Sequence, residues 1–119
     1  MCGVIGLFLK DKSLEPQLGR FLSEMLVSMT GRGPDSAGIA VYREADDGMF
    51  KITVQSDAPD KHFSGLAEIL HCRVEAIDTH AIITCPENTA LEIITKIQSM
   101  RELRIMSQGK SIAIYKEVG

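Results

Sequence analysis

Cys2 is the first residue whose place in the chain could support catalysis. Because this second residue is small, methionine aminopeptidase is expected to remove Met1 and leave Cys2 with a free α-amine beside its thiol. The reference pKa is about 7.7–8.0 for such an amine and about 8.5 for the thiol. One residue would then supply both a nucleophile and a nearby base. The simpler interpretation is that Cys2 is only the small residue that follows a start methionine.

A glycine-rich turn is the second feature, and it reads Gly31-Arg32-Gly33-Pro34-Asp35-Ser36-Ala37-Gly38. Its three glycines allow a tight backbone path and close approach to other groups. Arg32 and Asp35 form a charged pair that could hold a chain terminus through charge-assisted hydrogen bonds. The alternative is an ordinary surface turn built from residues that favour turns.

Together the two features resemble the class II glutamine amidotransferases of the N-terminal-nucleophile hydrolase superfamily. Residues 1–6 match an opening strand of the form Cys-Gly-Ile-x-Gly, and residues 32–39 match an Arg-Gly-x-Asp-x-x-Gly turn that follows a helix. The resemblance covers all 119 residues, most strongly 1–42. It is nearest to the glutaminase-like subunit of N-methylglutamate synthase and related glutamate-synthase-like complexes.

The resemblance implies a mechanism and roles for five residues. A terminal Cys thiolate attacks the side-chain amide of glutamine, the α-amine shuttles the proton, ammonia leaves, and water releases glutamate from a thioester. Cys2 would be nucleophile and base, and Arg32 would have a positioning role. Gly33, Asp35 and Gly38 match positions that shape the turn, whereas Pro34 and Ser36 fall at its variable positions and receive no catalytic role.

Three further elements of the family pattern have no match in this sequence. The family uses an Asn-Gly pair as oxyanion hole, an Arg after a His-Thr segment for the substrate carboxylate, and a later Asp for the substrate amine. Here Asn88 is followed by Thr89, and His80 precedes Ala81 with no Arg in register. Since one oxyanion donor is worth roughly 10²–10³ in kcat, we expect an N-terminal portion that is incomplete and inactive alone. The alternatives are a non-catalytic scaffold or regulatory module of the same fold, and a chain that forms no stable unit.

Hydrophobic periodicity indicates the elements that would position these residues. It predicts an α+β chain that forms part of an αββα sandwich, with residues 1–59 in the amidotransferase domain and 60–119 as a small α/β insertion. A helix with Ser13 as N-cap is expected to end at Gly31, and a hairpin turn at Asp46-Asp47-Gly48 is expected to join two neighbouring strands. Further helices are expected at 62–71 and after Pro86. The expected strands are 3–9, 37–43, 49–55, 73–77, 80–85, 103–107 and 111–115.

Composition narrows the partners and the compartment. The net charge is −3 with no basic block, and aromatic residues make up 5% of the chain without any Trp, which disfavours nucleic acid and anionic membranes as partners. No apolar run reaches the roughly 18 residues of a membrane span. The three cysteines lack the spacing of a disulfide framework, which favours the reducing cytoplasm. Cys72 and Cys85 could in principle form a disulfide, but a reducing compartment favours buried free thiols.

The ligand and partner expectations follow from the same residues. His62, His71, His80 and the cysteines lack the close paired spacing of a metal site. We therefore expect no metal and no organic cofactor in this chain. The resemblance implies glutamine as substrate and glutamate-synthase-like synthase subunits as partners, together with a missing C-terminal portion of the chain itself.

Overall fold

The computed structural model describes residues 2–33 and 35–118. The chain divides into two compact units, Met1–Ala37 with Glu117–Gly119 and Gly38–Lys116. The prediction that residues 60–119 form an insertion stays a prediction. The compact units do not follow a division at residue 59, because strand β2 (Met49–Gln55) pairs with strands from the later part of the chain.

The first unit holds an extended segment and a helix. Residues 2–9 form no strand in the described structure, so the expected strand at 3–9 is wrong as an element of a sheet. The 3₁₀ helix η1 (Lys12–Gln17) continues into α1 (Leu18–Ser28), followed by η2 (Thr30–Arg32). Asp11 rather than Ser13 caps η1, because its carboxylate accepts the Ser13 N–H at 2.9 Å. None of the described residues before residue 37 is buried.

The second unit is built on a four-stranded antiparallel sheet in the order β3-β4-β2-β5. Its other strands are β3 (Arg73–Ile77), β4 (His80–Pro86) and β5 (Arg104–Gly109). Strands β1 (Ser36–Tyr42) and β6 (Ile112–Val118) form a separate two-stranded ribbon. All six lie close to expected strands, and the mixture of helices with antiparallel sheets confirms the α+β class. The αββα sandwich remains a prediction.

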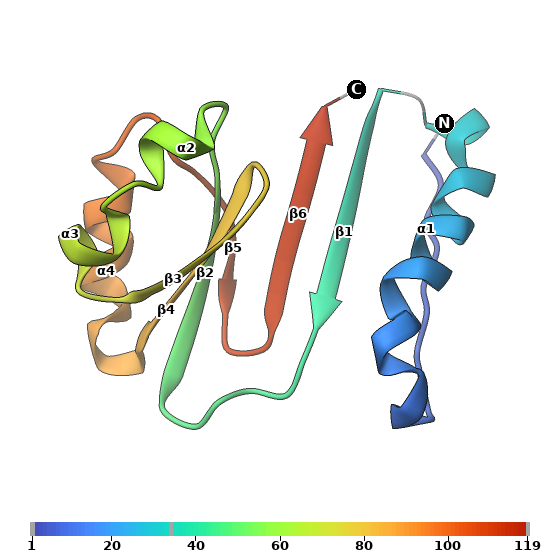
Figure 1. The fold of residues 1–119 in the computed structure, drawn as a ribbon, viewed down its shortest axis with the longest axis horizontal. Coiled ribbons are helices and arrows are strands. Elements are labelled where there is room, and N and C mark those ends of the chain that lie inside the picture. The colour runs from blue at the N-terminus through green and yellow to red at the C-terminus, as the bar shows by residue number, and fades with distance from the viewer. Residues whose placement is uncertain (1, 34, 119) are drawn as a thin grey trace. The chain divides into compact units, whose positions relative to one another are not determined.

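One face of the four-stranded sheet carries the hydrophobic core. Figure 1 shows α2 (Pro59–His62), α3 (Leu66–Leu70) and α4 (Ala90–Gln98) on that side of the sheet. Strand alternation sends every second side chain of β2 and β4 toward these helices. The central core side chains are almost fully buried: Ile52, Val54, Leu66, Leu70, Ala81, Ile83, Cys85 and Ile97.

Two local predictions about this unit are wrong. The expected hairpin between β1 and β2 does not form, because β2 pairs with β4 on one edge and β5 on the other, which leaves no edge for β1. The expected helix at 62–71 is broken at Gly65, whose φ of +73° is the left-handed conformation that glycine adopts readily. The helix expected after Pro86 does form: the short 3₁₀ helix η3 (Glu87–Thr89) leads into α4.

Candidate active site

Cys2 lies at the start of the extended segment and is exposed to solvent. Figure 1 shows this segment running alongside α1 in the first unit. Exposure alternates along it, with Val4 at 93% and Phe8 at 83% while Ile5 and Leu7 are half-buried. Alternate side chains of the segment are therefore sheltered, but the segment has no neighbouring strand and does not form the strand expected at 3–9.

The residue next to Cys2 packs against the end of the helix. A Cβ atom placed on Gly3 would lie 2.3 Å from Met29 Cε and 3.5 Å from Arg32 Cβ. Contacts under 3.0 Å require a neighbour to move, so only glycine fits here without displacing the Met29 side chain. Gly3 therefore packs beside Arg32. Gly3 directly follows Cys2, the nucleophile of the predicted site, and Arg32 is the arginine of its motif.

Two backbone hydrogen bonds, one of them from Arg32, fix the turn after α1. The Arg32 N–H donates to Met29 O at 2.9 Å, and the Gly33 N–H donates to Thr30 O at 3.4 Å. Gly33 has a φ of −165°, which is extended backbone open to any residue. Arg32 and Asp35 are both exposed, and no ion pair joins them within residues 2–33 and 35–118.

Gly38 lies apart from the turn that it was expected to shape. It is the third residue of strand β1 and belongs to the second compact unit. A Cβ on Gly38 would be 3.5 Å from Tyr115 O, an ordinary contact. Met1, whose removal is expected, and Pro34 lie outside the described residues. Of the five predicted site residues, Cys2, Arg32, Gly33 and Asp35 lie in the first unit, and Gly3, which follows Cys2, packs beside Arg32.

Met29 is the residue at this site that sequence reasoning missed as a neighbour of the nucleophile. The sequence predicts only that Met29 lies in the helix expected to end at Gly31. Its spacing from Met25 and Leu22 gave the signal, since it places Met29 at the last turn, beside the glycine-rich motif. In the structure its terminal methyl group occupies the space left by Gly3.

His80 of the second unit is buried in a structural role, whereas Asn88 of the same unit is exposed. His80 is 3% exposed, with Nε2 accepting the Lys116 N–H at 3.0 Å and Nδ1 3.0 Å from Thr79 Oγ1. Asn88 lies in η3. Ser56 Oγ lies 2.6 Å from His62 Nδ1, but Ser56 is fully buried and also accepts the Ala58 N–H, so the pair stabilises the start of α2.

Cys72 and Cys85 are free thiols in the second unit. Cys72 directly precedes Arg73 and Cys85 directly follows Thr84, so the two cysteines lie beyond the Arg73–Thr84 pair that ends the β3–β4 register. Burial raises the pKa of both thiols, and for Cys72 the nearby Lys96 partly offsets that effect. Both are therefore held as neutral thiols, unsuited to act as nucleophiles. No group of three or more His, Cys, Asp or Glu side chains suited to a metal occurs in the part of the chain that the structure describes.

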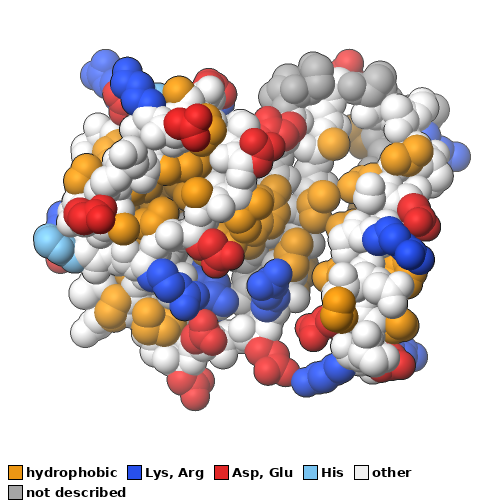
Figure 2. Space-filling model, in the orientation of Figure 1, with side chains coloured by type: hydrophobic (Ala, Val, Ile, Leu, Met, Phe, Trp, Pro, Cys, Tyr) orange, Lys and Arg blue, Asp and Glu red, His pale blue; other side chains and the backbone are white. Residues whose placement is uncertain are grey.

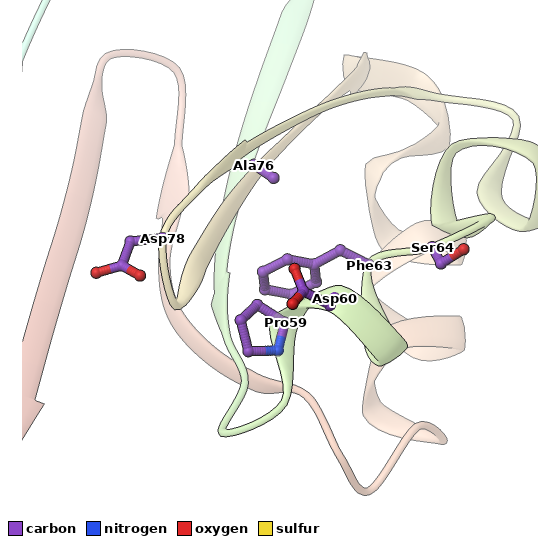
Figure 3. A pocket seen from close by; sticks show the side chains of 6 residues that line it. All are labelled: Pro59, Asp60, Phe63, Ser64, Ala76 and Asp78. Atoms are coloured by element: carbon purple, nitrogen blue, oxygen red, sulfur yellow. The ribbon is translucent and has the colours of Figure 1, made fainter.

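A shallow pocket of about 360 Å³ lies beside α2, lined by Pro59, Asp60, Phe63, Ser64, Ala76 and Asp78. In Figure 3 the Asp78 side chain stands apart from the group formed by Pro59, Asp60 and Phe63. The two carboxylates therefore do not converge on a common point, and this pocket contains none of the predicted site residues.

Two curated proteins match the whole of this chain. One is the "Glutamine amidotransferase-like protein GlxB" of Rhizobium meliloti (strain 1021), 46% identical over 125 residues that make up 42% of its length. The other, named "Putative glutamine amidotransferase", comes from Methanothermobacter thermautotrophicus (strain Delta H) and is 29% identical over 142 residues, 44% of its length. The chain is similar to proteins named as glutamine amidotransferases.

The similarity to these two proteins covers only part of their length. The chain spans less than half the length of these two relatives. No protein-family model matches it, and no solved structure gives a significant match. Among the described residues, no helix combines the length and apolar character that crossing a bilayer requires.

Proposed function

We propose that this chain supplies the nucleophile-bearing N-terminal part of a class II glutamine amidotransferase. The observation that supports the proposal is the packing of Gly3 against Met29 and Arg32, because Gly3 directly follows Cys2 in the chain. The similarity to two proteins named as glutamine amidotransferases supports glutamine as the substrate. The remaining substrate-binding and oxyanion groups would come from the part of such a protein beyond this chain.

The reaction begins at Cys2 after Met1 is removed. The α-amine takes the thiol proton, and the sulfur attacks the side-chain carbonyl carbon of glutamine. The tetrahedral intermediate collapses with loss of ammonia, which carries away the proton held by the amine, and leaves a glutamyl thioester on Cys2. Water then adds to the thioester, and the carbon–sulfur bond breaks to release glutamate and the free thiol.

The residues of the glycine-rich turn would help to position the Cys2 nucleophile. Arg32 is fixed by its backbone hydrogen bond to Met29, and its exposed guanidinium can reach an anionic group near the chain terminus. Gly33 and Asp35 set the path from η2 into β1, with Gly38 within that strand. We propose a glutamate-synthase-like synthase as the partner that consumes the ammonia.

A second candidate is a non-catalytic module that keeps the same fold. The observation that favours it is that His80, the nearest counterpart of one of the family's downstream groups, is engaged in a structural role in the second unit. Such a module would bind its partner equally well with Cys2 or with alanine at that position.

A Cys2→Ser substitution in the full-length protein separates the two candidates. The catalytic proposal expects glutamine hydrolysis to fall to background, because a serine hydroxyl beside the same amine is a far weaker nucleophile. Cys72→Ser is the matched control, since Cys72 is a half-buried thiol in the second unit and should leave the hydrolysis rate unchanged. Hydrolysis that survives Cys2→Ser would refute the catalytic role, and an inactive native protein would favour the module.

A further inference from the structure

A small cleft lies within the second unit, between the β1–β6 ribbon and the face of the four-stranded sheet that the helices leave free. Its volume is about 80 Å³. The lining side chains come from β1, β2, β3, β4, β6 and their ends: Val41, Arg43, Lys51, Arg73, Glu75, Ile82, Thr84, Ser111, Ile112, Ala113 and Tyr115. Three of these residues carry a positive charge, and none of them takes part in the proposed glutamine chemistry.

The strand register brings two of the cations to one row of the sheet. Lys51 of β2 and Arg73 of β3 are both paired with Thr84 of β4, so they flank Thr84 on the same face. Neighbouring strands are about 4.8 Å apart, which sets their Cα atoms roughly 10 Å apart. Arg43 approaches from the ribbon, where its N–H donates to Ser111 O at 2.9 Å.

These cations are poorly neutralised by the protein. The Lys51 side chain is only 16% exposed, yet its Nζ has Asp46 Oδ2 at 3.7 Å, too far for a hydrogen bond. Arg43 and Arg73 have no carboxylate within 4.0 Å across the described residues. Glu75 is the single acidic residue of the lining, against three cations. Lys51 is the one sheltered cation, and the excess of positive charge along the lining favours an added anion.

Tyr115 adds a neutral donor to this cleft. Burial raises the pKa of its phenol, Arg43 opposes that rise and Glu75 adds to it, so the hydroxyl stays protonated near neutral pH. The Thr84 side chain, 6% exposed, contributes a second hydroxyl at the floor. Figure 2 shows Lys and Arg side chains over this unit, with apolar side chains and Asp and Glu side chains beside them.

The volume fixes the size of the ligand. A single water needs roughly 10–15 Å³ of accessible space, and pockets for drug-sized ligands measure about 300–1,000 Å³. At about 80 Å³ the cleft has room for one compact oxyanion group and excludes a nucleotide. We propose that this cleft binds a small oxyanion, a carboxylate or a phosphate group, between Arg43, Lys51 and Arg73, independently of the Cys2 site.

The test is a titration of the ¹⁵N-labelled protein with sodium phosphate and, separately, with sodium succinate, at constant ionic strength set by sodium chloride. Saturable amide shifts are expected at the cleft strands with at least one of the two anions, and the stronger response identifies the class. Arg73→Gln should weaken that binding by about tenfold or more, the typical effect of losing a hydrogen bond to a charged group. Arg101→Gln, in an exposed turn outside the lining, should not.

Both Arg73 and Arg43 are exposed, so their replacement by glutamine should not unfold the unit. Arg43→Gln is the second variant and should weaken binding in the same way, with an unchanged thermal melt as its folding control. Shifts that stay linear in both salts, or equal binding by Arg73→Gln and Arg101→Gln, would overturn the proposal. Either result leaves the Cys2 proposal untouched, because glutamine hydrolysis is measured separately.

Discussion

The His80 side chain joins strand β4 of the four-stranded sheet to strand β6 of the two-stranded ribbon. Its Nε2 accepts the Lys116 N–H from β6, and its ring packs edge-on against Tyr115 with centroids 5.4 Å apart. Because a backbone amide can only donate, the lone pair is on Nε2, and the proton on Nδ1 faces Thr79 Oγ1. His80→Phe keeps an aromatic ring at this place and removes both polar partners.

The loss of folding free energy comes from the Lys116 N–H, which is left without an acceptor. A buried donor without a partner costs about 1–3 kcal/mol, and Lys116 is exposed enough for water to reduce that, so we expect about 1–2 kcal/mol. In a domain of this size each kcal/mol lowers Tm by roughly 4–8 °C. His80→Phe should therefore lower Tm by roughly 4–16 °C, measured by circular dichroism.

Amide exchange localises the effect. The Lys116 amide should exchange about 5–30 times faster in His80→Phe, the factor that corresponds to 1–2 kcal/mol. The Arg43 amide, which donates to Ser111 O in the same ribbon, is the internal control and should change much less. A variant that melts like the native protein with Lys116 still protected would refute this reasoning.

Three further predictions concern the core, the turn and the thiols. Ile83→Ala empties a fully buried position and should lower the free energy of unfolding by about 2–5 kcal/mol in a urea titration. Gly3→Ala should displace the Met29 methyl group, seen as a shift of its ¹³C-methyl resonance, because the new Cβ would lie 2.3 Å from Met29 Cε. Since burial raises the pKa of Cys72 and Cys85, iodoacetamide near pH 8 should modify both more slowly than it does in urea.

Matched controls accompany these variants. Val4→Ala, at a position 93% exposed, should change the free energy of unfolding by no more than about 0.5 kcal/mol. Gly6→Ala should leave the Met29 resonance in place, because a Cβ there meets nothing within 4 Å. Equal effects of Gly3→Ala and Gly6→Ala would contradict the packing described at the site, and equally fast alkylation of folded and unfolded thiols would contradict their burial.

Elements that depend on local pattern could be predicted from the sequence. The apolar spacing of α1 and the alternation in β2 and β4 each show which side of the element is apolar. That side depends only on the spacing of residues close together in the chain. Pairing partners are not local, which is why the Asp46-Asp47-Gly48 turn suggested a hairpin although both edges of β2 are taken by β4 and β5. The break at Gly65 could have been read from the residue itself.

The candidate site divides in the same way. Cys2 and Arg32 could be named because their motifs are short and sequential, and the contact of Gly3 with Arg32 brings those motifs together. The expected strand at 3–9 has the right extended backbone, but a strand is defined by a neighbour that its own sequence does not encode. The cationic cleft was not predicted, since Lys51 and Arg73 come to one row only through the pairing of β2 and β3 with β4, and Arg43 joins them from the β1–β6 ribbon.

The central claim is that Cys2 becomes the N-terminal nucleophile of a glutamine-hydrolysing site. The most direct measurement is the intact mass of the purified full-length protein before and after treatment with an electrophilic diazoketone analogue of glutamine. The account predicts a species that lacks Met1 and carries a single adduct on Cys2, with glutamine slowing its formation. Retention of Met1, or an adduct that forms equally well on Cys2→Ser, would contradict it.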